Sequence, residues 1–78
     1  MKCKIVSAKE SRVFDNVLSI VIPNTAQGQI QILPQHAESF ILLNEGEMTI
    51  EKVSGESQEF EINQGLCHIR DDTVTVVF

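Results

Sequence analysis

Residues 65–78 read GLCHIRDDTVTVVF, and this stretch indicates the fold class. Apolar and polar side chains alternate on both sides of Asp71-Asp72, as they do in strands that bury one face. Adjacent carboxylates are typical of a tight turn, because Asp tolerates turn conformations and bonds to nearby backbone groups. The stretch therefore predicts a β-hairpin with strands over 66–70 and 73–77.

The same period-two alternation recurs toward the N-terminus, and no window keeps the i, i+3, i+4, i+7 spacing of an amphipathic helix. Leu18, Ile20 and Ile22 are expected to share one face of a short, half-buried strand that Pro23 ends, since proline lacks the ladder donor. Further strands are predicted at 2–7, 13–17, 29–33, 40–43, 46–51 and 59–62, with polar turns at 8–11 and 25–28.

These elements predict one all-β domain over residues 1–78, a small sandwich or flattened barrel of about eight to ten short, mostly antiparallel strands. Within strand 46–51 the acidic residues should face solvent, and Met48 and Ile50 should face the core. The periodicity of the four apolar residues 40–43 is compatible with either a strand or one helical turn. We interpret this run as a short strand.

The charge balance argues against nucleic acid as a partner. Six basic residues stand against eleven acidic ones, a net charge of −5 without any basic cluster. All four aromatic residues are Phe, which leaves few side chains for base stacking or ligand cages. Because no apolar run reaches membrane-spanning length and no signal-peptide pattern opens the chain, we expect a soluble intracellular protein.

The residues suited to chemistry do not form a recognisable catalytic or metal site. Cys3, His36, Cys67 and His68 lack the close pairing of zinc ligands, and we expect free thiols. Strand parity points Cys67 and His68 to opposite faces, so they cannot act as nucleophile and base. The four glycines stand singly at turns and form no phosphate loop. We therefore expect no catalytic residue, no metal and no cofactor.

Residues 28–37 read GQIQILPQHA, followed by Leu43 and Gly46. This run resembles the G-x-F-G-I-L-P-G-H-A signature of the epsilon subunit of F-type ATP synthases, called delta in mitochondria. The similarity extends over the whole chain, in order and approximate spacing, through segments 5–7, 13–14 and 74–76 and through Ile50 and Gly65. It implies the N-terminal β-sandwich of that family, without the C-terminal helical hairpin.

Four positions depart from the family pattern. Gln31 and Gln35 stand where the family usually has glycine, Asn24 follows Pro23 where a glycine is common, and Glu38 replaces a frequent proline. A glutamine held at positive φ would be strained, because its Cβ crowds the backbone there. These departures concern loop conformation and leave the fold expectation unchanged.

The resemblance implies a non-catalytic rotor subunit that couples the gamma subunit to the c-ring in proton-driven ATP synthesis. It implies a peripheral position at the cytoplasmic face of the inner membrane, with membrane association only through the complex. By family position, the residues expected to contact the c-ring are Gln29, Gln31, Pro34, Gln35 and His36. Those expected to contact gamma are Ser7, Ile41 and Leu42. For Ile41 and Leu42 the competing interpretation is ordinary core, because an apolar run is also typical of a strand buried on both faces.

Two other functions remain open at this point. The run from His36 through Glu38 and Gly46 to residues 63–65 superficially resembles a cupin-like barrel that binds a small ligand or metal. The chain lacks an H-x-H pair and the second histidine motif, and it is short for such a barrel. A stand-alone adaptor that dimerises through its sheet edges is the other alternative, and oligomeric state in solution would reveal it.

Overall fold

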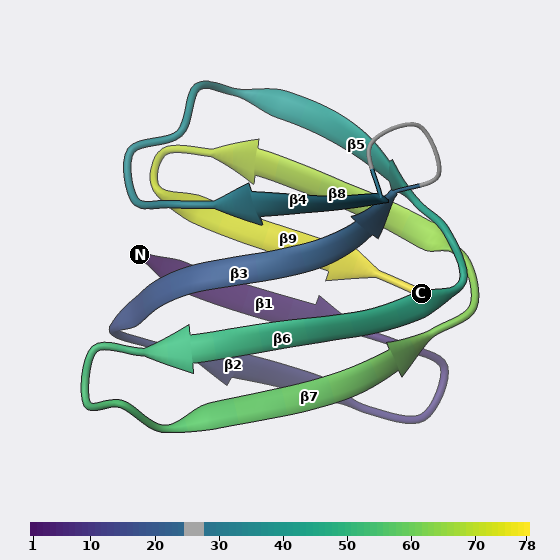
Figure 1. The fold of residues 1–78 in the computed structure, drawn as a ribbon, viewed down its shortest axis with the longest axis horizontal. Coiled ribbons are helices and arrows are strands. Elements are labelled where there is room, and N and C mark those ends of the chain that lie inside the picture. Colours follow the sequence, from purple (N-terminus) through teal and green to yellow (C-terminus); the bar gives the residue numbers. More distant parts are fainter. Residues whose placement is uncertain (25–27) are drawn as a thin grey trace.

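The computed structural model describes residues 1–24 and 28–78, which form nine strands and no helix (Figure 1). The strands are β1 (Lys2–Val6), β2 (Ser11–Phe14), β3 (Val17–Asn24), β4 (Gly28–Ile32), β5 (Ser39–Leu43), β6 (Gly46–Lys52), β7 (Ser57–Ile62), β8 (Gly65–Arg70) and β9 (Thr73–Val77). The described residues contain no helix that is long and apolar enough to cross a membrane.

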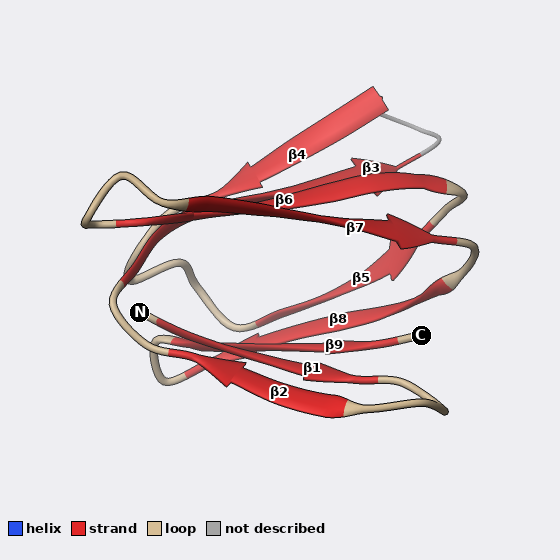
Figure 2. Cartoon of the chain, turned by 90° about the horizontal axis from the view of Figure 1, so that it is seen from below, coloured by secondary structure: helices blue, strands red, loops and turns tan. Residues whose placement is uncertain are grey.

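Two sheets pack face to face, as Figure 2 shows from the side. One sheet has five strands in the order β2-β1-β9-β8-β5, and the other has four in the order β4-β3-β6-β7. Neighbouring strands are antiparallel except β1 and β9, which run parallel in the middle of the five-stranded sheet. The predicted all-β sandwich of short, mostly antiparallel strands is confirmed.

The core lies between the sheets and takes alternate residues from each strand. Met48 and Ile50 face it from β6, as predicted, and Cys67 and Ile69 face it from β8. Such alternation buries one face of each sheet and leaves the other exposed. Further buried apolar side chains are Cys3, Ile5, Phe14, Val17, Ile20, Ile22, Ile32, Leu43, Ile62, Val74 and Val76.

An arginine joins the two sheets along the edge formed by β2 and β7. The guanidinium of Arg12 on β2 donates a hydrogen bond to Gln58 Oε1 on β7 at 3.1 Å. It also lies 4.8 Å from the ring centre of Phe14 and 5.6 Å from that of Phe60, and the two rings meet edge to face. In such cation–π contacts the positive guanidinium is attracted to the faces of the aromatic rings.

Strand β3 differs from its prediction because it contains a bulge. The register with β6 shifts between Val17 and Ser19, and the extra residue turns Leu18 outward, 43% exposed, whereas Ile20 and Ile22 stay buried. The expectation of one shared face for Leu18, Ile20 and Ile22 was therefore wrong. An alternation rule cannot anticipate a bulge that changes parity within a strand.

The boundaries of β2 and β3 also differ from expectation. Pro23 does not end β3: it pairs with Gln29 on β4, beyond the last rung shared with β6, so the strand is eight residues long. The predicted strand 13–17 is split at Asn16, whose φ is 55°, so that Val17 opens β3. Residues 25–27 of the predicted 25–28 turn lie outside the described residues.

Candidate functional site

An exposed apolar row crosses four of the five strands of the larger sheet. Leu42 on β5 pairs with Leu66 on β8, Leu66 with Val77 on β9, and Val77 with Val6 on β1, so the four side chains line up on the outer face. Their exposed fractions are 71%, 38%, 46% and 39%, in that order. We call this set the apolar row. A contiguous exposed apolar patch of this kind is typical of an interaction surface.

A stacked ring pair extends the outer face of β5 and β8 two rungs from the apolar row. Phe40 on β5 lies opposite His68 on β8, with ring centres 4.2 Å apart and planes within 6° of parallel. His68 Nε2 lies 3.3 Å from the carboxylate of Glu38, the residue before β5. Phe40 is 68% exposed, so it enlarges the apolar surface beside Leu42.

The residues expected to contact gamma occupy different environments. Ile41 points inward and packs against the core, whereas Leu42 points outward. Ser7 lies in the β1–β2 turn, where its Oγ donates to Glu10 O at 3.2 Å and accepts the N–H of Lys9 and of Glu10. Ser7 and Leu42 are three strands apart, and the apolar row connects them.

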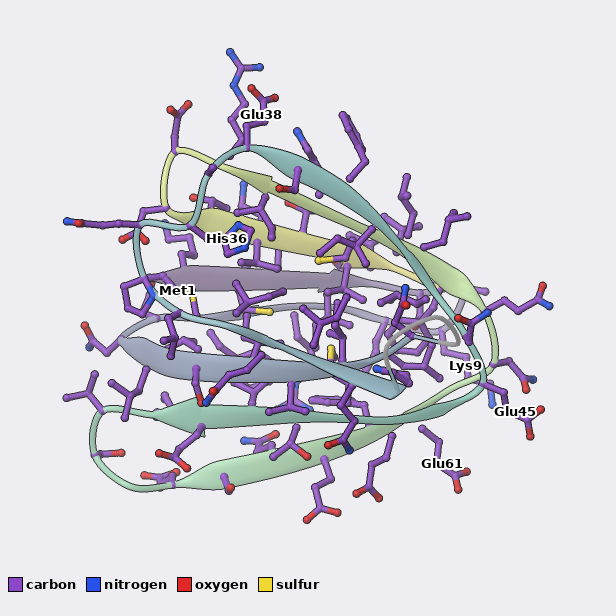
Figure 3. The ribbon with its side chains drawn as sticks, turned by 45° about the horizontal axis from the view of Figure 1, so that its top comes forward. Met1, Lys9, His36, Glu38, Glu45 and Glu61 are labelled. Atoms are coloured by element: carbon purple, nitrogen blue, oxygen red, sulfur yellow. The ribbon has the colours of Figure 1, made fainter. Side chains whose placement is uncertain are left out.

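The residues expected to contact the c-ring lie in β4 and in the loop that follows it. Gln29 and Gln31 are exposed on β4, where they pair with Pro23 and Val21 of β3. Pro34, Gln35 and His36 are exposed in the loop 33–38. Figure 3 shows His36 at one end of the sandwich, opposite the end that carries Lys9, Glu45 and Glu61.

Gln35 adopts the left-handed conformation anticipated from its replacement of glycine. Its φ is 65°, which costs a non-glycine residue about 1 kcal/mol. Its backbone N–H donates to Asp72 Oδ1 at 2.9 Å. Gln31, by contrast, lies in the extended strand β4 and has no positive φ.

The outer face of the four-stranded sheet is acidic. Glu47 and Glu61 stand directly opposite each other on β6 and β7, and Glu59 stands opposite Thr49 two rungs away, on the same face. A hydrogen bond with Glu59, followed by the like charges of Glu59 and Glu61, raises the pKa of Glu47. Carboxylates on these strands keep a sheet face solvated and its edge unattractive to other strands.

The two thiols are buried and free, as predicted. Burial, together with the neighbouring Cys67, raises the pKa of Cys3 to about 12, and burial raises that of Cys67 to about 11. His68 lies on the outer face, away from the Cys67 thiol. Within residues 1–24 and 28–78, His, Cys, Asp and Glu side chains form no group of three that could hold a metal ion.

Sequence reasoning missed most of the apolar row. Leu66 and Val77 carry a local signal, because each adjoins an inward residue and must point outward. No local pattern in the sequence indicates that Val6 and Val77 are neighbours, since their contact follows from the pairing of β1 with β9.

A broad depression of about 660 Å³ opens at the end of the sandwich away from His36. Lys9, Glu45, Glu47, Glu61 and Phe78 contribute to its walls. Charged side chains stand beside apolar ones in its walls and the depression is open to solvent, in contrast to the enclosed apolar pockets that bind small molecules.

Comparisons with known proteins agree with this architecture. The model of the ATP synthase delta/epsilon chain β-sandwich domain matches residues 1–78. The ATP synthase epsilon chain of Psychrobacter arcticus is 31% identical over 77 residues, 99% of this chain and 55% of that protein. The epsilon chain of Xanthomonas campestris pv. campestris is also 31% identical, over 99% of this chain and 54% of its own length. The chain thus spans about half the length of these relatives.

Solved structures share the fold. A chain in the central stalk/c-ring structure of the Tetrahymena thermophila mitochondrial ATP synthase matches with a TM-score of 0.81 and 18% identity, covering 99% of this chain and 61% of that one. A chain in the OSCP/F1/c-ring structure of the Euglena gracilis enzyme matches with a TM-score of 0.85 and 21% identity, covering 96% and 48%. With the family model matching every residue, this chain belongs to the β-sandwich domain family of ATP synthase delta and epsilon chains.

Proposed function

We propose that this chain is a non-catalytic subunit of the central stalk of an F-type ATP synthase, where it couples the gamma subunit to the c-ring in proton-driven ATP synthesis. Its relatives are ATP synthase epsilon chains, and one fold neighbour comes from a central stalk/c-ring assembly. A coupling subunit needs surfaces that hold two partners at once, and it needs no reactive group of its own.

The apolar row is the observation that carries this proposal. Leu42 at one end supplies direct contact with gamma, Ile41 supports the same strand from inside, and Ser7 shapes the turn next to the other end. Apolar side chains in a contiguous patch gain free energy when a partner removes them from water. The row therefore supports a gamma-facing surface on the outer face of the five-stranded sheet.

The loop 33–38 and β4 form the second surface in this proposal. Pro34, Gln35 and His36 are exposed at one end of the sandwich, and Gln29 and Gln31 lead toward them on β4. These groups suit hydrogen bonding to the polar loops of a c-ring. β4 belongs to the four-stranded sheet and the apolar row to the five-stranded sheet, so the two surfaces lie on different parts of the molecule, as simultaneous binding of two partners requires.

In this proposal the chain lies at the cytoplasmic face of the inner membrane and is held there only through the complex. The acidic face with Glu47, Glu59 and Glu61 would be repelled by anionic lipid headgroups, which supports an indirect association. The match of the family model to residues 1–78 favours the rotor subunit over a cupin-like barrel or a stand-alone adaptor.

Binding to gamma tests the first surface. Leu42→Asp should weaken binding to the gamma subunit from the same organism more than tenfold, because a carboxylate desolvated in an apolar interface costs well over about 1.4 kcal/mol. Val53→Asp is the matched control: Val53 is 67% exposed, close to the 71% of Leu42, but lies in the β6–β7 turn. Equal affinities of the two variants in calorimetry would refute the assignment.

Assembly onto the ring tests the second surface. His36→Ala should leave the circular dichroism spectrum and gamma affinity unchanged and should weaken only association with a detergent-solubilised c-ring, because an exposed loop side chain contributes little to packing. Unfolding of this variant would instead identify His36 as a structural residue and remove it from the proposed contact.

A further inference from the structure

An aspartate on the larger sheet contacts the loop that follows β4. Asp72 lies in the β8–β9 turn, 37 positions along the chain from Gln35, and its Oδ1 accepts the Gln35 backbone N–H at 2.9 Å. The bond joins the hairpin of the five-stranded sheet to the connection between the two sheets. It falls at the residue whose left-handed backbone replaces the usual glycine of the family signature.

We propose that Asp72 is a positioning residue that holds the loop 33–38 in the conformation that meets the c-ring. This inference rests on the proposed function of the loop. A glutamine at φ 65° is strained, because negative φ is lower in energy for a residue with a Cβ. Relaxation to negative φ would redirect Pro34 and His36 on either side of it. A hydrogen bond from its N–H to a carboxylate opposes that relaxation, because charge-assisted bonds are the stronger class.

The Asp72 carboxylate is itself held in place. The backbone carbonyl of Asp72 accepts the N–H of Lys2 at 3.1 Å, and the Asp72 Oδ2 atom lies 3.8 Å from the Met1 ammonium. That ammonium donates to Val17 O at 3.1 Å. The turn and the first strand therefore fix the position from which the carboxylate reaches Gln35.

Neighbouring groups do not substitute for this contact. The carboxylate of Asp71, the other aspartate of the turn, is 88% exposed and lies 3.5 Å from Arg70 Nε. Inside the loop, His36 Nδ1 and Ser39 Oγ bond to Ala37 O at 2.8 and 3.1 Å, which shapes the loop locally. Glu38, the last residue of the loop, lies 3.3 Å from His68 on β8, whereas the bond from Asp72 ties Gln35 at the tip of the loop to the five-stranded sheet.

The test compares two glycine variants of one turn. Asp71 and Asp72 have φ values of 51° and 57°, and glycine accepts both, so Asp72→Gly and Asp71→Gly differ only in the carboxylate that is lost. In Asp72→Gly, hydrogen exchange of the Gln35 amide, followed by NMR, should become at least about tenfold faster. In Asp71→Gly it should stay within about twofold of the original chain.

The second readout is association with the ring. With gamma present, Asp72→Gly should weaken binding to the detergent-solubilised c-ring about five- to tenfold, Asp71→Gly less than twofold, and neither should change gamma affinity. Asp72→Asn keeps an acceptor oxygen and should restore most of the ring affinity.

The outcomes separate this inference from the proposed function. Unchanged Gln35 exchange in Asp72→Gly, or ring affinity equal to that of Asp71→Gly, overturns the positioning role. If the original chain itself fails to bind the ring, the proposed function falls, and with it the c-ring part of this inference. The exchange measurement then still decides whether Asp72 holds the loop.

Discussion

The outer faces of the two sheets are built by the same alternation but carry opposite chemistry. The five-stranded sheet exposes Leu42, Leu66, Val77 and Val6 in one row, whereas the four-stranded sheet exposes facing carboxylates on β6 and β7. The inward residues on both are equally apolar, so folding alone does not require the difference. The contrast indicates that one face is adapted to a protein partner and the other to water.

The largest expected effect separates two neighbouring residues of β5. Ile41→Asp should lower the free energy of unfolding by about 3 kcal/mol, because it places a carboxylate against the core. Leu42→Asp, on the outer face, should cost under about 1 kcal/mol. Urea denaturation measures both changes. Similar losses in the two variants would mean that the face of β5 that bears the apolar row is not a free surface.

A smaller effect concerns the edge that joins the two sheets. Arg12→Ala should destabilise the fold by about 1–2 kcal/mol, through loss of the bond to Gln58 and of the contacts with Phe14 and Phe60. Arg70→Ala, which removes an exposed arginine from a turn pair, should change stability by less than about 0.5 kcal/mol. Thermal unfolding measures both changes. Equal midpoint temperatures for Arg12→Ala and Arg70→Ala would contradict this expectation.

The smallest effect sharpens the description of the acidic face. Glu59→Gln should move the pKa of Glu47 back toward its ordinary value, because both leading causes of the raised pKa come from Glu59. A carboxyl whose pKa is raised by folding binds its proton more tightly in the folded chain, so stability falls as pH rises through the range between the unfolded and folded values. The Glu59→Gln variant should therefore lose less stability than the original chain as the pH rises through this range.

NMR titration of the Glu47 side chain measures this change directly. Glu51→Gln is the matched control, since Glu51 lies on the same face of β6 but does not contribute to the raised pKa of Glu47. An unchanged Glu47 titration in Glu59→Gln would show that the two carboxyls do not share a proton.

The sequence predicted the fold well where parity was regular. The 66–70 and 73–77 hairpin and the inward Met48 and Ile50 follow from alternation alone. Prediction was wrong at Leu18, where a bulge shifts parity, and at Pro23, which fits within β3 because it is paired on one side only.

The candidate surfaces were harder to predict, because they depend on contacts between distant segments. Family position named Ser7 and Leu42, but the row that connects them requires knowing that β1 and β9 are neighbours. Replacement of glycine by Gln35 pointed to a strained backbone, which the structure contains. Nothing local to residue 35 indicated that Asp72 would bond to it.

The parallel pair of β1 and β9 sets an order for how this chain reaches its native state. Because β9 lies between β1 and β8, the five-stranded sheet cannot close until β9 has left the ribosome, while β6 and β7 can pair as a hairpin earlier. Joining segments so far apart in sequence carries a large loop-closure entropy and slows folding. Until then β1 and β8 each expose an unpaired edge, so the newly made chain depends on protection from aggregation in that interval.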